Sequence, residues 1–517
     1  MDKILFGQSY YLRFDSKLWQ AMQPYPPLGT LYAASYLRSS GYPVALFDAM
    51  LAESEADWQQ ALTSERPRYA VIYEDNFNYL SKMCLQRMRQ AAFTMIQQAK
   101  QHDCVIIVCG SDATDHYELY IQNGADYVLI GEGEHTLIEL LDALTHHPEP
   151  ALGEILGLAY RVNLKNTDWE IKINPRRPDI KELDSLPFPA WDLVDVPRYQ
   201  EIWRGKHGYY SMNMVTTRGC PYHCSWCAKP IWGQRYNVRS PENVVRELKW
   251  LVNNYKPDHI WFADDIFGLR PGWLQEYARL LEKENLHVPF KCLSRVDLLL
   301  RSGEIEAFKR SGAQTIWVGA ESGSQKILDA MEKGTTVNQI YEATRAVKSA
   351  GIKIAFFLQF GYPGETREEI NQTMQMVWDL MPDDIGMSVS YPLPGTKFFT
   401  RIKDQLGPKH NWIDSSDLAM MYAGPFITQF YRQLHVVLHK EYRRRKYWRQ
   451  LKYILSHPTH LTIRSLRQTA VMLFYTVSLP FDRHYLNRLA TIPHQGIAEL
   501  QGGMNYEQAS TPDPQKG

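Results

Sequence analysis

The chain has 517 residues, its 57 lysines plus arginines balance 57 aspartates plus glutamates, and 44% of its residues are hydrophobic. This length exceeds what one ordinary core supports, and this apolar content is typical of globular proteins rather than disordered ones. The balanced charge gives no global field toward nucleic acid, so we expect no nucleic-acid partner.

Targeting signals and disulfides are also not expected. The first residues lack the apolar core of a signal peptide, and the best apolar stretch, 470–480, is about half of the ~20 residues that span a bilayer. Seven cysteines, an odd number, argue against a disulfide framework. We therefore expect a soluble, cytoplasmic protein.

Residues 1–145 alternate short apolar runs with helical patterns, which is typical of a parallel sheet wrapped in helices. Helices are expected near Gly29–Arg38, Lys82–Lys100 and Glu134–Leu144. Five strands in this rhythm predict a doubly wound, Rossmann-like or flavodoxin-like α/β domain. The expected strands are Ile4–Gly7, Val44–Phe47, Tyr69–Tyr73, Val105–Cys109 and Tyr127–Ile130.

Residues 146–205 have a different texture. The segments 157–162 and 169–173 predict a hairpin around an Asn-Thr-Asp turn, and the proline-rich segment after them predicts an extended linker.

The strand–helix rhythm returns in residues 206–400. Ser240 followed by Pro241, and Thr366 with Glu369 three residues later, are helix start signals. Six units predict a partial (β/α)6 barrel similar to a TIM barrel, with its chemistry at the carboxyl ends of the strands. The expected strands are Met212–Thr217, His259–Phe262, Phe290–Ser294, Thr315–Gly319, Lys353–Phe360 and Gly386–Tyr391.

The C-terminal part predicts a helical cap at 401–500 and a disordered tail at 501–517. Between Arg432 and Arg467, ten lysines and arginines face one acid, with aromatic residues interleaved. Such a helix either touches an anionic membrane or RNA, or is a solvated face packed on the barrel.

Three cysteines, Cys220, Cys224 and Cys227, form the motif C-x3-C-x2-C directly after the first expected barrel strand. Thiolates with this spacing on one loop can ligate an iron–sulfur cluster. Three ligands on a four-iron cluster leave one iron open for a reactant. The alternative is a structural zinc site with His223 as fourth ligand, but His223 is adjacent to Cys224 and would point away.

This motif, with Trp226 before the last cysteine on the first loop of a partial barrel, resembles the radical S-adenosylmethionine (SAM) superfamily. The resemblance implies a [4Fe-4S] cluster whose open iron binds SAM, which is cleaved reductively to a 5′-deoxyadenosyl radical. It also implies a reducing partner such as flavodoxin or ferredoxin. By the same resemblance, the SAM-binding positions at the later strand ends are Asp264, Asp265, Arg295, Glu321, Ser322, Gly361 and Pro392.

Each of these positions also has a structural interpretation. Asp264 can cap a helix, Arg295 can pair with Asp297, and the glycines can serve turns.

The N-terminal domain has glycine-rich loops where the carboxyl edge of such a sheet binds ligands. Together they resemble the cobalamin-binding domain of cobalamin-dependent radical SAM enzymes. No D-x-H-x-x-G motif is present, so the resemblance implies cobalamin bound without a histidine ligand; the alternative is a domain that has lost its cofactor. The expected cobalamin-binding residues are Pro27, Leu28, Gly29, Gly110, Ser111, Thr114, Gly131, Glu132, Gly133 and Glu134.

The resemblance implies methylation of an unactivated carbon of a small-molecule or lipid substrate. One SAM supplies the methyl group through cobalamin and a second SAM supplies the radical. A cyclase of the anaerobic magnesium-protoporphyrin ester type shares every motif, and a non-enzymatic metal-binding module is the other alternative. A methylthiotransferase needs a second set of three cysteines, whereas Cys84, Cys104 and Cys109 are expected to be buried and inert.

Overall fold

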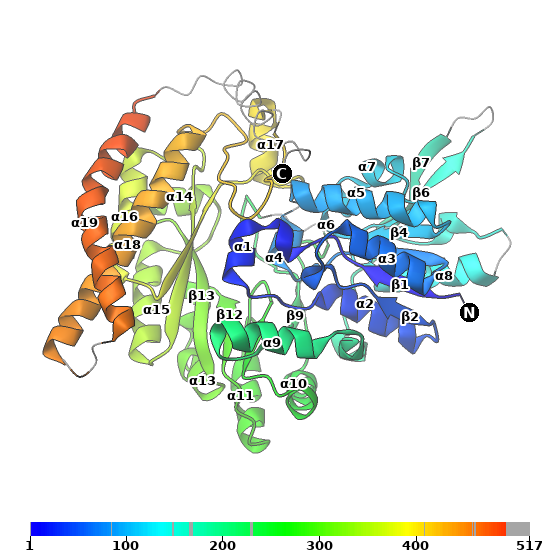
Figure 1. Cartoon of the computed structure of the whole chain (residues 1–517), viewed down its shortest axis with the longest axis horizontal. Coiled ribbons are helices and arrows are strands. Elements are labelled where there is room, and N and C mark those ends of the chain that lie inside the picture. The colour runs from blue at the N-terminus through cyan, green and yellow to red at the C-terminus, as the bar shows by residue number, and fades with distance from the viewer. Residues whose placement is uncertain are drawn as a thin grey trace, which may run out of the picture.

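The structure is a computed structural model that describes residues 2–83, 85–146, 149–164, 169–227, 231–407, 409–457, 459 and 462–492. Two sheets, each built mainly of parallel strands and covered by helices, lie beside each other. A helical C-terminal region covers the outer side of the second sheet (Figure 1). The predicted α/β fold class is confirmed. Cys84, the predicted turn at 166–168 and the predicted tail at 501–517 lie outside the described residues.

The first sheet has the strand order β2-β1-β3-β4-β5-β6-β7. Its first five strands are parallel in the flavodoxin-like order. The predicted hairpin pairs antiparallel with β5 and so continues this sheet. The predicted strands are confirmed with ends within one residue: β1 (Ile4–Gly7), β2 (Val44–Leu46), β3 (Tyr69–Tyr73), β4 (Val105–Cys109), β5 (Tyr127–Leu129), β6 (Leu158–Asn163) and β7 (Trp169–Ile173).

Helices cover both faces of this sheet because the strands are apolar on both sides. Trp58 of α3 and Met95 of α5 pack on one face, whereas Leu37 of α2 and Leu140 of α8 pack on the other. The helices are α1 (Ser16–Ala21), α2 (Leu28–Ser39), α3 (Glu55–Glu65), α4 (Tyr79–Lys82), α5 (Gln86–Gln101), α6 (Ser111–Asp115), α7 (Tyr117–Gln122) and α8 (Glu134–His146).

The helix predicted at Lys82–Lys100 was placed too early. Asn78 accepts a hydrogen bond from the Leu80 amide at 2.9 Å and starts the separate short helix α4, which ends at Lys82. The longer helix α5 begins at Gln86. This break places α4 beside the barrel.

The second sheet has six parallel strands in the order β15-β14-β13-β12-β11-β8. Ser240 and Thr366 cap their helices as predicted, and Glu369 completes the capping box. The strands are β8 (Ser211–Met214), β11 (His259–Phe262), β12 (Phe290–Ser294), β13 (Ala313–Glu321), β14 (Lys353–Phe360) and β15 (Asp384–Val389). The helices are α9 (Val196–His207), which precedes the sheet, α10 (Pro241–Tyr255), α11 (Trp273–Lys283), α12 (Val296–Leu299), α13 (Glu304–Arg310), α14 (Gln325–Ala330), α15 (Val337–Ser349) and α16 (Arg367–Leu380).

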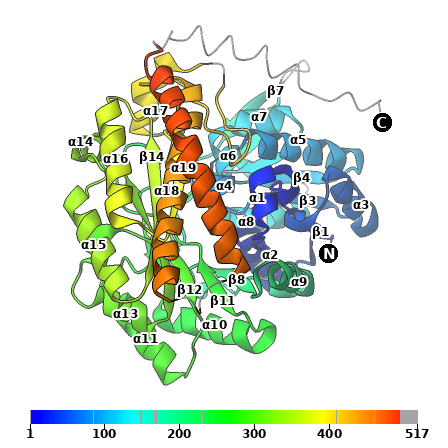
Figure 2. The ribbon, with the colours of Figure 1, turned by 60° about the vertical axis from the view of Figure 1, so that its left-hand side comes forward.

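The C-terminal region is helical, as predicted, with α17 (Lys397–Ile402), α18 (Thr428–Ser456) and α19 (Ile463–Leu489). Tyr431, Leu434 and Leu438 of α18 are buried in the same core as the barrel. Figures 1 and 2 both show α19 alongside α18 on the outside of the barrel. Within the described residues, none of the helices combines the length and apolar content needed to span a bilayer.

Candidate functional site

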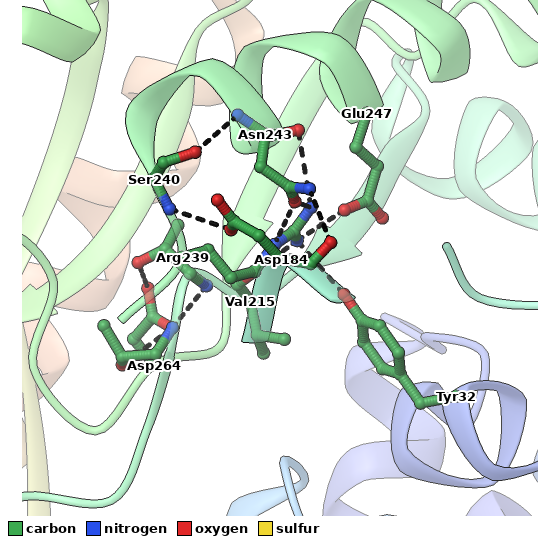
Figure 3. A network of polar contacts seen from close by, with 10 residues as sticks. Tyr32, Asp184, Val215, Arg239, Ser240, Asn243, Glu247 and Asp264 are labelled. Carbon is green, nitrogen blue, oxygen red and sulfur yellow. Dashed lines mark hydrogen bonds and ion pairs between the residues drawn. The ribbon is translucent and has the colours of Figure 1, made fainter. Parts of the chain in front are cut away.

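The turn after β8 is held by Asp264, which follows β11. The Asp264 carboxylate accepts from the backbone N–H of Thr216 at 2.7 Å and of Thr217 at 2.8 Å (Figure 3). It also accepts from both threonine hydroxyls, at 2.7 and 3.0 Å. Burial raises the pKa of Asp264 to about 6, and these hydrogen bonds oppose the rise. Asp264 therefore shapes the backbone that leads to Cys220.

The cysteine loop follows this turn. Cys220 is buried, and Cys224 and Cys227 are partly exposed. Ser225 anchors the loop: its N–H donates to the Met331 carbonyl at 2.9 Å, and its hydroxyl lies 2.7 Å from the Tyr362 hydroxyl. The loop is thereby fixed against the carboxyl ends of β13 and β14.

The zinc alternative requires ligands that converge on one ion. Among the residues that the structure describes, no three His, Cys, Asp or Glu side chains are close enough to hold one. A four-iron cluster differs because each cysteine binds a separate iron atom, so its three sulfurs stand farther apart. The donor set of three cysteines on one anchored loop fits such a cluster.

Two cations lie beside this loop. Burial alone would lower the pKa of Lys333, but the negative charges of Glu321 and Cys224 outweigh burial and raise it. Lys333 is 2.8 Å from Glu321, a residue at the end of β13 with a left-handed backbone (φ 57°). The Arg295 guanidinium stacks 3.6 Å over the ring of Tyr222, which lies within the loop. Lys333 and Arg295 can offset the negative charge of a thiolate-bound cluster.

Arg295 also makes the pair that the structural interpretation expected. Its Nε donates to Asp297 at 2.9 Å, and its Nη2 donates to the Lys333 carbonyl at 3.0 Å. The side chain is buried rather than on the surface, so the pair with Asp297 holds the guanidinium next to the loop.

The N-terminal domain reaches this site through α4. Lys82 forms an ion pair of 2.7 Å with Asp265, so the two acids that end β11 have different partners. Tyr79 is 58% exposed. Even so, desolvation by the surrounding protein raises its pKa, and the charges of Glu321 and Cys227 add to the rise. Tyr79 therefore lies near Glu321 and Cys227, on the side of the cysteine loop that faces the first domain.

The other expected SAM positions are packed against neighbouring elements. The Ser322 hydroxyl lies 3.1 Å from that of Thr373 in α16. A Cβ on Gly361 would come within 3.0 Å of Met420, and Pro392 is buried. All seven expected positions lie at or just after strand ends of one sheet, and Arg295 and Glu321 are the ones that reach the cysteine loop through Tyr222 and Lys333.

At the carboxyl edge of the first sheet, Glu132 and Glu134 bind the guanidinium of Arg218, at 2.5 and 2.8 Å. Arg218 precedes Cys220 by two residues, so this buried cluster joins the glycine-rich loop to the cysteine loop. Trp232 donates to Glu132 at 3.2 Å and stacks on Phe77. A pocket with about 200 Å³ of empty space lies among these side chains and Gly29.

The expected glycines serve internal packing. A Cβ on Gly110 would lie 2.8 Å from Glu74, and one on Gly133 would lie 2.6 Å from the Cys109 sulfur. A Cβ on Gly29 would lie 3.0 Å from the Asn76 amide. Of the other expected residues, Pro27 and Leu28 start α2, and Thr114 accepts from the Gly131 N–H at 3.1 Å.

Several polar atoms at this edge have no hydrogen-bond partner although they are buried. They follow β1, β3 and β4, around the point where the strand order reverses. Buried polar groups normally find partners, so these atoms indicate a missing ligand or water. Within the described residues, they are Gln8 Nε2, Asn76 Oδ1 and Ser111 Oγ.

Arg239, which follows β10 (Asn237–Val238), is a second link between the domains (Figure 3). Its guanidinium donates to the Tyr32 hydroxyl of α2 at 3.1 Å, to the Val215 carbonyl at 2.8 Å and to Asn243 at 2.8 Å. It also forms an ion pair of 2.5 Å with Glu247. This network was not predicted, and neither were Arg218, Lys333 or Tyr79. Of these residues, Arg218 alone had a signal in the sequence, because it lies two residues before the cysteine motif.

Fold and site together define a partial parallel barrel with a cysteine loop on its first strand. Residues 214–377 match the Radical SAM superfamily, and the barrel is therefore a radical SAM domain. A domain of this class uses a [4Fe-4S] cluster and SAM, and it needs a reductant and a small-molecule substrate.

Similarity extends beyond the barrel. An uncharacterized methyltransferase of Pyrococcus horikoshii is 29% identical over 394 residues, covering 75% of this chain and 81% of that protein. The anaerobic magnesium-protoporphyrin IX monomethyl ester cyclase of Rubrivivax gelatinosus is 26% identical, covering 74% and 67%. Among solved structures, the cobalamin-dependent SAM radical enzyme OxsB with aqua-cobalamin bound has a TM-score of 0.70 at 17% identity and covers 98% of this chain and 75% of OxsB. This last match shows the fold of both domains.

Proposed function

We propose that the chain is a cobalamin-dependent radical SAM enzyme that methylates an unactivated carbon of a small-molecule or lipid substrate. The observation that carries this proposal is the contact between the two carboxyl edges. Lys82 and Tyr79 from the first domain meet Asp265 and the cysteine loop of the second. Two cofactors bound at these edges would face a common space.

In this proposal Cys220, Cys224 and Cys227 hold the cluster, which supplies an electron to SAM when bound. Arg295 and Lys333 balance the charge of the thiolates, and the expected SAM positions are Arg295 and Glu321 with Asp265 and Ser322. Asp264 acts by fixing the turn before Cys220. The first domain, which contacts the barrel beside its strand ends through Lys82 and Asp265, would help to exclude water.

Cobalamin, when bound, would carry the methyl group. The unpartnered atoms of Gln8, Asn76 and Ser111 fit a ligand with many amide side chains at the strand-order reversal. The pocket beside Arg218 is too small for a corrin, so the proposal requires the side chains around Arg218 to move aside.

The experiment is anaerobic reconstitution of the purified chain with iron, sulfide and cobalamin, then incubation with SAM and a reductant. We expect 5′-deoxyadenosine from the wild type and none from Cys220→Ala, Cys224→Ala or Cys227→Ala. Cys104→Ala is the matched control, because burial raises the pKa of this thiol to about 11 and keeps it protonated. Retained SAM cleavage in any of the three loop variants would overturn the cluster assignment.

The second candidate is a non-methylating cyclase, which the similarity to the Rubrivivax protein favours. The mass of the product separates the two: one added methylene unit means methylation, whereas loss of hydrogen or gain of oxygen means cyclisation or oxidation. For either reaction we propose flavodoxin or ferredoxin as the electron donor.

We also propose that α19 contacts an anionic membrane surface. Seven of its apolar and aromatic residues are at least half exposed, and most recur at intervals of three or four, so they share one face. Arg464, Arg467 and Arg488 lie on the same helix, and eight further lysines and arginines lie on α18. An exposed apolar face beside basic residues is typical of helices that lie on membranes. The residues are Ile463, Leu466, Leu473, Phe474, Val477, Phe481 and Tyr485.

Co-sedimentation with vesicles tests this contact. We expect the wild type to bind vesicles containing phosphatidylglycerol, and the double variant Phe474→Ser/Phe481→Ser to lose most of this binding. Trp169→Ser, on β7 and 38% exposed, is the control and should bind normally. Equal binding by both variants, or no binding by the wild type, would contradict the proposal.

A further inference from the structure

The inner face of the barrel sheet is open. Successive residues of each strand point to opposite faces of the sheet. Phe262 and Phe290 point to the outer face, where they pack on each other and Phe262 packs on Tyr277 of α11. The opposite parity faces inward: the rings of Trp317 and Phe357 stack there with centroids 4.6 Å apart. Phe357 is 41% exposed although β14 lies between β13 and β15, so none of the described helices covers this part of the face.

Lys291 of β12 lies on the same inner face. Its ammonium is 4.8 Å from the ring centroid of Trp261 and 5.3 Å from that of Tyr25. Within the described part of the chain, this ammonium has neither a carboxylate nor a hydrogen-bond acceptor as partner. Burial lowers the pKa of Lys291 to about 8, so the group still carries its charge at neutral pH. A charge enclosed by aromatic rings without a counterion is unusual.

Neighbouring polar groups do not supply the missing anion. The Ser211 hydroxyl is hydrogen-bonded both to His259 and, at 2.9 Å, to the Tyr25 hydroxyl. These two hydrogen bonds fix the Tyr25 ring beside Lys291. Burial, with the charge of Lys291, lowers the pKa of His259 to about 3, so the imidazole is neutral. Asn213 Oδ1, on β8 in register with Trp261, also lacks a partner.

The register sets the distance from Lys291 to the reactive end of the barrel. Lys291 pairs with Thr315, and Leu293 pairs with Trp317, so the aromatic rings lie above Lys291 toward the strand ends. β12 ends three residues later, at Ser294. At about 3.3 Å per residue, Lys291 lies roughly 10 Å below Ser294 and roughly 13 Å below Arg295.

We infer that the inner face of the barrel binds the substrate, and that the substrate is an apolar or planar molecule with a carboxylate or phosphate group. The anionic group binds Lys291, the body lies against Trp317 and Phe357, and the reacting carbon lies at least about 10 Å from the anion. This inference rests on the proposed function, because that function places the radical at the strand ends.

The test uses two probes of nearly equal shape, 2-naphthoate and its neutral analogue 2-naphthamide, titrated calorimetrically into the anaerobically reconstituted protein. We expect the wild type to bind naphthoate at least tenfold more tightly than the amide. Lys291→Met should abolish this preference and Lys291→Arg should keep it. Lys309→Met, an exposed lysine on α13, is the control and should behave as wild type.

A preference for naphthoate that survives in Lys291→Met would overturn the inference, as would a wild type that binds both probes equally or neither. Thermal melts of the variants show whether they are folded. The assay does not require SAM cleavage, so its failure and the failure of the proposed function are distinguishable.

Discussion

Asp264 offers the sharpest test of how the cysteine loop is built. The resemblance to radical SAM enzymes assigns this carboxylate to SAM, whereas the structure occupies it with Thr216 and Thr217. The two roles separate when Asp264→Asn is compared with Asp264→Ala. Asparagine keeps Oδ1 for both backbone N–H groups, and its NH2 replaces Oδ2 and can donate to the Thr216 hydroxyl, which is able to accept. Alanine loses all four hydrogen bonds.

The magnitudes follow from the environment of the group. A buried N–H left without a partner costs about 1–3 kcal/mol, so two cost roughly 2–6 kcal/mol in the alanine variant relative to the asparagine variant. Raising the pKa from 3.8 to about 6 corresponds to roughly 3 kcal/mol against the buried charge at neutral pH. Asparagine removes that cost, so Asp264→Asn should be at least as stable as the wild type.

The assays are the urea midpoint, the iron content after reconstitution, and SAM binding by equilibrium dialysis. We expect Asp264→Asn to match the wild type in iron content and to change SAM affinity less than threefold. Asp264→Ala should have a lower midpoint and less iron. The reasoning would be refuted if Asp264→Asn were as unstable as the alanine variant. It would also be refuted if Asp264→Asn stayed stable but bound SAM more than tenfold more weakly.

Two further predictions concern the barrel. Gly323→Ala should lower the free energy of unfolding by about 1–3 kcal/mol, because its Cβ would lie 2.4 Å from the Gln372 carbonyl. Gly205→Ala is the control and should not lower it, because the space around Gly205 is open. Equal urea midpoints of the two variants would contradict this prediction. Burial raises the pKa of Glu365 from about 4.5 to about 8, so the folded protein holds a proton that the unfolded chain loses, and stability should fall as pH rises between these values. Glu365→Gln should flatten that slope, by at most roughly 5 kcal/mol across the window, and melting curves from pH 5 to 8 with unchanged slopes would show the assignment to be wrong.

Buried parallel strands were predictable from sequence. Ile4–Gly7, Tyr69–Tyr73 and His259–Phe262 have the predicted bounds because each is a short apolar run between turn signals, with most of its side chains buried on both faces. The cysteine motif was likewise visible, because its spacing is local.

Partners that meet only after folding were not predictable. Asp264 and Asp265 are adjacent and look equivalent, but one holds the turn after β8 and the other pairs with Lys82, 183 residues away in the sequence. Lys333 is equally inconspicuous until the loop after α14 brings it to Glu321. The glycines of the first domain are predicted as ligand contacts, and at Gly110 and Gly133 the packing of the folded chain also leaves no room for a Cβ.

The central claim is that Cys220, Cys224 and Cys227 hold a four-iron cluster with one iron open to SAM. Electron paramagnetic resonance of the reduced, anaerobically reconstituted protein tests it most directly. We predict the signal of a [4Fe-4S]⁺ cluster whose g-values change when SAM is added. An iron-free protein with zinc at the loop, or a cluster signal that SAM leaves unchanged, would contradict the account.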